Sequence, residues 1–264
     1  MRRRLSGSGA LASLTIVLAT LLGAVADAAA QTPPPPSTGR PDFLFGQPSG
    51  SVAVRGGWVF ARAGSDVFDF VRDRLTVENN DFNTAAIAAD YGLALSPRLD
   101  AVIGLDFSRA QIASEYRNLV DNNRLPIEQT TSLQELNLTG GLRFALRPRG
   151  RDISRLAWIP NSVVPYVGAG GGVLRYDFEQ NGDFVDEGVP GPNQPIFSDV
   201  FQAGGWTPSA HVFGGVDLKV YRRWYLTLDG RYIWAAGDLG QDFQRFDPID
   251  LAGFRFGAGI NVVF

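Results

Sequence analysis

Hydrophobic and polar residues alternate with a period of two through much of the chain after residue 50. The clearest case is the last stretch, residues 251–264, where alternate positions are either apolar or small and polar. Such a period predicts a β-strand with one apolar and one polar face. The apolar face carries Phe254, Phe256, Ala258, Ile260, Val262 and Phe264, and the other face carries Gly253, Arg255, Gly257, Gly259, Asn261 and Val263.

Seven earlier stretches show the same alternation, which predicts about eight strands in all. The stretch 164–178 is the least clear, because Gly168, Gly170, Gly171 and Gly172 leave its facing ambiguous and allow a bulge. The predicted strands are 52–60, 85–95, 99–108, 135–146, 164–178, 209–220, 224–234 and 251–264.

The connections between these strands alternate in length. Short turns lie at 96–98 and 221–223, and long polar segments lie at 63–83, 116–131, 179–204 and 237–249. Short turns on one side and long loops on the other are typical of an all-β, transmembrane, antiparallel up-and-down β-barrel. The even strand number places both ends of the barrel on the short-turn side. The long link 147–164 is the exception to the pattern.

Aromatic residues gather near the predicted strand ends, where the two interfacial girdles of a membrane barrel would lie. Examples are Trp58, Phe144, Trp224 and Trp234. A soluble β-sandwich is the alternative, with the aromatic residues in its core. It would have to explain why nearly every strand has a polar face in an exported chain that has no cysteine for a disulfide.

The first residues predict export through a cleaved signal peptide, residues 1–30. Arg2, Arg3 and Arg4 precede an apolar region at 11–25 that is short for a membrane span, and an Ala-x-Ala site lies before Gln31. Cleavage before Asp27 and an uncleaved anchor are the alternatives. A proline-rich linker is expected at 31–50 and the barrel at 51–264. No other apolar run reaches about 18 residues, which excludes a helical membrane protein.

The net charge argues against nucleic acid as a partner. The chain carries −3 at pH 7. Removal of residues 1–30 takes away three arginines and one aspartate, +2 in all, and leaves −5. Nucleic-acid binding needs a basic footprint.

Several motifs resemble the small eight-stranded bacterial outer-membrane β-barrels of the OmpA-barrel, OmpX and OmpW type. These are Ser96-Pro97-Arg98-Leu99-Asp100, the stretch 165–170, Gly230-Arg231-Tyr232, Asp250-Leu251-Ala252-Gly253 and the terminal Phe264. The resemblance covers 51–264 and implies a Gram-negative cell outer membrane, with its lipid and lipopolysaccharide as partners. It also implies that the barrel-assembly machinery reads Gly259, Val262 and Phe264 as an insertion signal. Since no peptidoglycan-binding domain follows Phe264, an OmpA-like anchoring role is not expected.

Charged residues on the polar faces are expected to point into the barrel. An eight-stranded barrel is only wide enough for its side chains, so these charges must pair. A salt-bridge network that plugs the lumen is one interpretation, and a gated path for a small solute is the other. The residues are Arg55, Asp90, Asp100, Asp106, Glu135, Arg143, Asp217, Lys219, Asp229, Arg231 and Arg255.

Other candidate chemistry is weaker. His211, the only histidine, shares a face with Ser209, which invites comparison with lipid A deacylases, but this face points into the lumen and the order of the two residues is reversed. We expect His211 to be a lumen hydrogen-bond partner. The stretch 177–183 resembles the start of a calcium loop, but Gly188 stands where the bidentate Glu belongs. No catalytic residue, metal or cofactor is predicted.

Apolar residues in the first and third long segments leave two interpretations open. They either pack on strands that extend beyond the membrane or form an apolar mouth for a small hydrophobic ligand, as in an OmpW-like barrel. The residues are Phe68, Phe70, Val71, Phe197, Val200, Phe201 and Trp206.

The sequence thus gives three hypotheses. The first is a non-enzymatic barrel with a plugged lumen and a structural or surface-interaction role. The second is a porin-like narrow channel or lateral-exit transporter for small hydrophobic compounds. The third is a lipid A-modifying enzyme.

Overall fold

A computed structural model describes residues 43–264, apart from 122, 155–156 and 187–193. The predicted signal peptide and most of the predicted linker lie outside the described residues. Among those described, no helix is long and apolar enough to cross a membrane.

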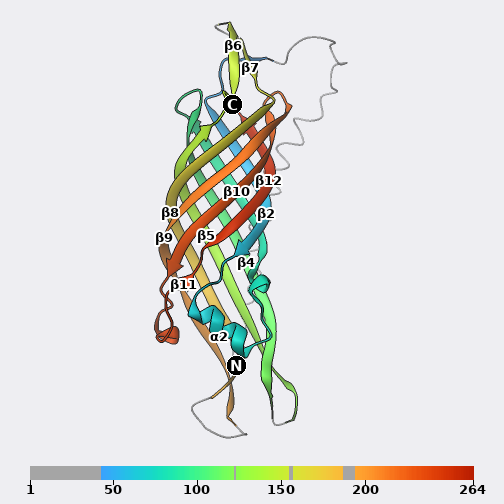
Figure 1. Cartoon of the computed structure of the whole chain (residues 1–264), viewed down its shortest axis with the longest axis vertical. Helices are drawn as coiled ribbons and strands as arrows, with labels where there is room; N and C mark the ends of the chain where they lie inside the picture. The colour runs from blue at the N-terminus through green and yellow to red at the C-terminus, as the bar shows by residue number, and fades with distance from the viewer. Residues whose placement is uncertain (1–42, 122, 155–156, 187–193) are drawn as a thin grey trace, which may run out of the picture. The chain divides into compact units, whose positions relative to one another are not determined.

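Antiparallel strands form a closed ring in which each strand pairs with its neighbours in the sequence and the last pairs with the first (Figure 1). All the predicted strands are present, and the up-and-down barrel is confirmed. The eight strands are β2 (Gly50–Ala61), β3 (Thr84–Ala94), β4 (Leu99–Val120), β5 (Pro126–Ala145), β8 (Val163–Val185), β9 (Ile196–Tyr221), β10 (Trp224–Gly237) and β12 (Gly253–Val263).

The terminal strand closes the ring. β12 pairs with β2 from Gly253↔Ala61 to Val263↔Ser51. Beyond it, the Phe264 amide donates to the Gly50 carbonyl at 2.9 Å, and the Phe264 carbonyl accepts from the Ser49 amide at 2.7 Å. Ring closure satisfies the backbone groups that an open sheet would leave unpaired at its edges.

The outside of the ring is apolar. Every strand of the ring carries large hydrophobic side chains with an exposed fraction of about two-fifths or more. Examples are Trp58, Ile103, Leu142 and Phe256. A continuous apolar surface around a barrel matches the lipid-facing band of a membrane protein. On β4 and β8 this band gives way to polar residues, with Arg109 following Phe107 and Arg175 following Val173 on the outward face.

The ambiguous strand has a regular facing. Val164, Tyr166 and Leu174 point inward, and the pairing of β8 with both neighbours runs without a register shift. The inward position of Gly168 has a steric reason, since a Cβ there would collide with the Phe213 ring.

Four strands continue well beyond the apolar band, so the prediction of loops at 116–131 and 179–204 is wrong for much of both segments. β4 and β5 pair as far as Val120↔Pro126, and β8 and β9 pair as far as Val185↔Ile196. Outside the membrane both faces of a strand can carry polar residues, which conceals the alternation.

The first long segment, 63–83, was predicted as a polar loop but contains helix α2 (Asp66–Arg74) and the short helix η1 (Asn79–Phe82). Acidic residues in the first turn of α2 and arginines in its last turn stabilise the helix through favourable interactions with its dipole. Its apolar side lies in a hydrophobic cluster at the long-loop end, which we call the apolar plug. The plug consists of Ala63, Val67, Phe68, Val71, Leu75, Val77, Phe82, Ile112, Leu133, Leu174, Tyr176, Phe178, Ala203, Leu239, Phe243, Ile249 and Leu251.

The last long segment also contributes to the plug, through η2 (Gln241–Phe243) and β11 (Ile249–Asp250), which pairs with β10.

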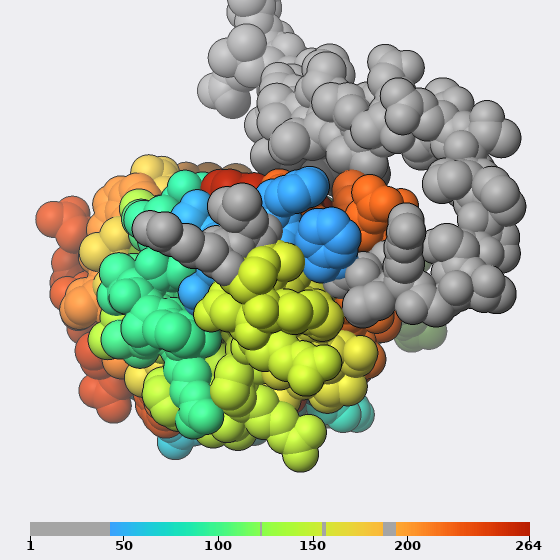
Figure 2. Space-filling view, turned by 90° about the horizontal axis from the view of Figure 1, so that it is seen from above, coloured from blue at the N-terminus to red at the C-terminus, as the bar shows by residue number. Residues whose placement is uncertain are grey.

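The opposite, short-turn end is also covered. The link 147–164, predicted without strands, forms a hairpin of β6 (Gly150–Ser154) and β7 (Ala157–Pro160), and β1 (Leu44–Phe45) adds a third strand. The hairpin lies over the middle of this end, beside the first described residues (Figure 2). Trp158 of β7 is buried, so the hairpin forms a cap on this end of the barrel.

Candidate functional site

The lumen holds the charged side chains that the alternation places inside. Within the described residues they form three ion-pair clusters. We name them the lower, middle and upper clusters, counted from the short-turn end, which is drawn at the top of Figure 1, toward the apolar plug. Most of these side chains are less than a tenth exposed. Charges buried to this extent must be paired and hydrogen-bonded.

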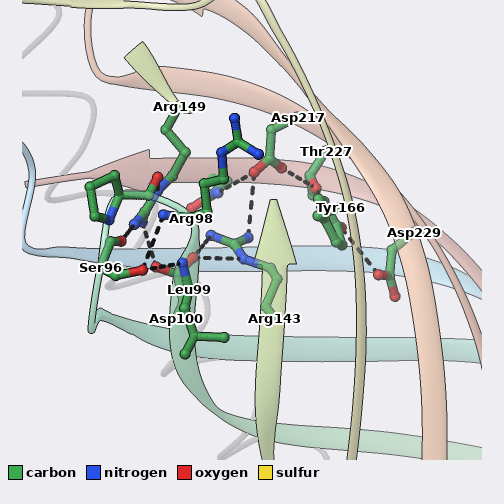
Figure 3. Close-up of polar contacts among 12 residues, drawn as sticks. Ser96, Arg98, Leu99, Asp100, Arg143, Arg149, Tyr166, Asp217, Thr227 and Asp229 are labelled. Atoms are coloured by element: carbon green, nitrogen blue, oxygen red, sulfur yellow. Dashed lines mark hydrogen bonds and ion pairs between the residues drawn. The ribbon is translucent and has the colours of Figure 1, made fainter. Parts of the chain in front are cut away.

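The lower cluster centres on Asp100 of β4 (Figure 3). Arg143 of β5 donates to Asp100 Oδ2 through Nη2 at 2.9 Å and Nε at 3.0 Å, and its Nη1 lies 3.4 Å from Asp217 Oδ2. Arg149 donates to the other oxygen of Asp100. Two guanidinium groups thus balance two carboxylates.

The middle cluster alternates two arginines with two aspartates. Arg55 lies 2.5 Å from Asp90 and 3.5 Å from Asp229. Arg231 lies 3.7 Å from Asp90 and 3.9 Å from Asp229, and its guanidinium stacks 5.0 Å from the centre of the Phe213 ring. Glu135 belongs to the upper cluster, where it pairs with Arg255.

The upper cluster has one cation and two anions. Arg255 of β12 donates to Asp106 of β4 through Nη1 and to Glu135 of β5 through Nη2. If both carboxyl groups are ionised, this cluster carries −1, whereas the other two are neutral.

Neutral side chains complete the hydrogen bonding of the lower carboxylates. Thr227 donates to Asp217 at 2.6 Å and Asn261 donates to it at 3.3 Å. The Tyr166 hydroxyl donates to Asp229 at 3.1 Å and lies 3.3 Å from the Thr227 hydroxyl, so Tyr166 links the lower and middle clusters (Figure 3).

Two placements differ from the simple inward pattern. Lys219 lies half-buried close to the β9–β10 turn, below the three clusters. Arg149 was missed, because it lies in the link for which no facing could be read. Its proximity to the turn at 96–98, whose backbone carbonyls it also contacts, brings it to Asp100.

The clusters leave little empty space. Three small cavities lie along them, of about 30, 10 and 20 Å³. Arg143 lines the first and second of these, and Arg55 lines the second and third. Such volumes hold one or two water molecules at most. The apolar plug lies beyond one end of this row of clusters and cavities, and the cap lies beyond the other.

The Ser209–His211 pair is not arranged for catalysis. The Ser209 hydroxyl donates to Asn137 Oδ1 at 2.9 Å rather than to His211. His211 is buried and stacks on Phe213, and its Nδ1 has no hydrogen-bond partner in the described structure. A nucleophile requires its base within hydrogen-bond reach.

The calcium-like stretch 177–183 is part of β8 and does not form a loop. Asp177 lies 3.5 Å from Arg175, and Glu179 accepts from Gln202 at 3.1 Å. An extended strand sends successive side chains to opposite faces, so it cannot wrap a cation. No group of residues suited to holding a metal occurs in the described part of the chain.

The apolar residues of the predicted mouth separate into two groups. Phe68 and Val71 are fully buried in the apolar plug. Phe70, Phe197 and Phe201 line an open cleft of about 280 Å³ beside it. Val200 and Trp206 are exposed and line neither feature.

Comparison with solved structures returns small outer-membrane barrels at low identity. Neisserial surface protein A is 12% identical, with a TM-score of 0.43 over 81% of this chain and 96% of that one. OprG from Pseudomonas aeruginosa is 10% identical, with a TM-score of 0.45 over 84% and 99%. Ail of Yersinia pestis is 13% identical, with a TM-score of 0.38 over 81% and 99%. No family model and no curated protein matches the chain.

Because these TM-scores are low, the assignment of the fold rests not on the similarity to solved structures but on the closed ring of strands and its apolar exterior. They define a small eight-stranded transmembrane β-barrel, and the resemblance inferred from the sequence is confirmed at the level of the fold.

Proposed function

We propose that this protein is a non-conducting, non-enzymatic β-barrel of the cell outer membrane whose role is structural or depends on its surface. The observation that carries the proposal is the closed lumen. An apolar plug, three ion-pair clusters and a strand cap follow one another along the barrel. A barrel of eight strands has no space for a solute path beside such side chains.

The outward parts are then left to carry the function. The long extensions of β4, β5, β8 and β9, with α2 between them, form the part that would face the outside of the cell, above outer-membrane lipid and lipopolysaccharide. The bond of Ser209 to Asn137 argues against the lipid A-modifying hypothesis. Lipid A mass spectrometry with and without the protein should show unchanged acyl chains.

Permeability of proteoliposomes tests the closed lumen. The purified protein should release small sugars from vesicles no faster than protein-free vesicles do. Release that increases with protein content, and that decreases with solute size, would defeat the proposal.

A second candidate function is binding of small hydrophobic compounds at the long-loop end. The phenylalanine-lined cleft favours it, because an apolar concave surface exposed to solvent is typical of ligand sites. This function needs no path through the lumen.

A further inference from the structure

The wall of the cleft beside the apolar plug is largely aromatic. The rings brace one another, with Phe184 edge-to-face on Phe201 at 4.6 Å between centroids and stacked near Phe197 at 5.9 Å. A wall of mutually packed rings is preformed and offers faces and edges for an apolar body. The phenylalanines that line the cleft are Phe70, Phe184, Phe197, Phe201, Phe243 and Phe246.

The floor of the cleft is polar. Gln180 of β8 points inward, is 5% exposed and lines the cleft, and its amide makes no hydrogen bond with the described residues. Thr131 lies opposite Gln180 on β5 but is fully buried and does not line the cleft, and its hydroxyl has no hydrogen-bond partner among the described residues. Buried polar groups without partners are unfavourable. Of these two groups only the Gln180 amide lines the cleft beside the apolar wall, and it points to a ligand that brings a hydrogen-bonding group.

The charged residues around the cleft favour a ligand whose polar group is neutral. Arg74 and Asp242 both line it, one of each sign. The second floor amide, Gln129, is already engaged, donating to the Asp183 carbonyl at 2.8 Å. An ionised ligand group at Gln180 would be buried against a neutral amide, which is costly.

We propose that this cleft binds a small neutral amphiphile, with an aromatic or alkyl body among the phenylalanine rings and one hydroxyl or carbonyl group hydrogen-bonded to Gln180. The inference deepens the second candidate function and rests on it. The volume of about 280 Å³ is at the small end for ligand pockets and suits a body of one or two rings.

The test compares three probes of one shape: naphthalene, 1-naphthol and 1-naphthoate. Binding is measured by calorimetry with the full chain in lipid nanodiscs, after subtraction of empty nanodiscs. We expect 1-naphthol to bind more tightly than the other two. Gln180→Leu should weaken 1-naphthol about five- to tenfold and leave naphthalene unchanged. Gln111→Leu, on the outward face of β4, is the matched control and should change neither.

Two further variants keep the test independent of one substitution. Phe197→Ala removes part of the wall and Val185→Trp fills the cleft, so both should weaken all three probes. Phe45→Ala at the other end should not. Heat-modifiable gel mobility verifies that each variant is folded.

Equal binding of 1-naphthol and naphthalene, a preference that survives Gln180→Leu, or tightest binding of 1-naphthoate would each overturn the proposal. Absence of saturable binding for all three would remove the cleft as a site and the second candidate function with it. The closed lumen is measured separately by permeability, so it would be unaffected.

Discussion

Phe68 on α2 packs edge-to-face against Phe178 on β8, with ring centroids 6.1 Å apart and an interplanar angle of 80°. The two residues are far apart in the sequence, and their contact fixes the helix of the first long segment against the inner face of the barrel. Phe68 also meets Phe82 at 4.8 Å. The apolar plug is therefore a packed core and not a loosely placed loop.

Phe68→Ala should lower the free energy of unfolding by about 3–5 kcal/mol, the usual cost of removing a fully buried phenylalanine. Urea unfolding in lipid vesicles, followed by tryptophan fluorescence, measures this cost. Phe70→Ala on the same helix is the control, and because Phe70 is 41% exposed it should cost about 1 kcal/mol or less. Equal costs would contradict the packing of α2 into the barrel.

Arg255→Met should destabilise the barrel by about 3–5 kcal/mol, because it leaves Asp106 and Glu135 buried without their cation. Glu135→Gln should cost much less, since Arg255 keeps Asp106. Arg62→Met is a surface control, with an arginine side chain that is 63% exposed beside Asp250, and it should change stability by about 1 kcal/mol at most. If Glu135→Gln proved as costly as Arg255→Met, the upper cluster would not be organised as described.

Arg149→Ala should cost about 1.5–3 kcal/mol, the range for a hydrogen bond to a charged group. The loss is limited because Asp100 keeps Arg143. Arg151→Ala, two residues away on exposed β6, should have almost no effect. The same unfolding measurement distinguishes them, and the reverse order would mean that Arg149 does not tie the cap to the lumen.

Phe264→Ala should reduce the amount of folded barrel in the outer membrane of cells while leaving refolding of purified protein into vesicles nearly unchanged. The reason is that the terminal aromatic residue is expected to be read by the assembly machinery, whereas its backbone bonds to Gly50 and Ser49 survive the substitution. Phe256→Ala, a similarly exposed residue of β12, is the control. Normal assembly of Phe264→Ala would remove the insertion-signal hypothesis.

The sequence predicts the ring well because period-two alternation depends only on which face meets lipid, and this holds for every strand inside the membrane. The same alternation places the charges of β2–β5, β9, β10 and β12 that form the three clusters on the inner face, but it also places Lys219 there, which lies half-buried near the β9–β10 turn. Partners such as Arg255 with Glu135 could not be derived, since they depend on strand stagger and barrel shear.

The covered ends were missed for different reasons. Helix α2 left a readable signal, since Val67, Phe68 and Val71 have helical spacing and Ser65 precedes two acidic residues in the first turn. The cap formed by β6 and β7 left little signal in the sequence, because short strands without clear alternation resemble an irregular link. The strand extensions beyond Arg109 and Arg175 were hidden by their polar outer faces.

Single-channel recording in planar bilayers tests the closed lumen most directly. The purified full chain, verified as folded by heat-modifiable mobility, should insert without reproducible current steps at moderate voltage. Phe68→Ala should remain silent as well, because the three ion-pair clusters still fill the lumen below the plug. Reproducible steps of defined size from the unmodified chain would contradict the closed lumen and favour a channel.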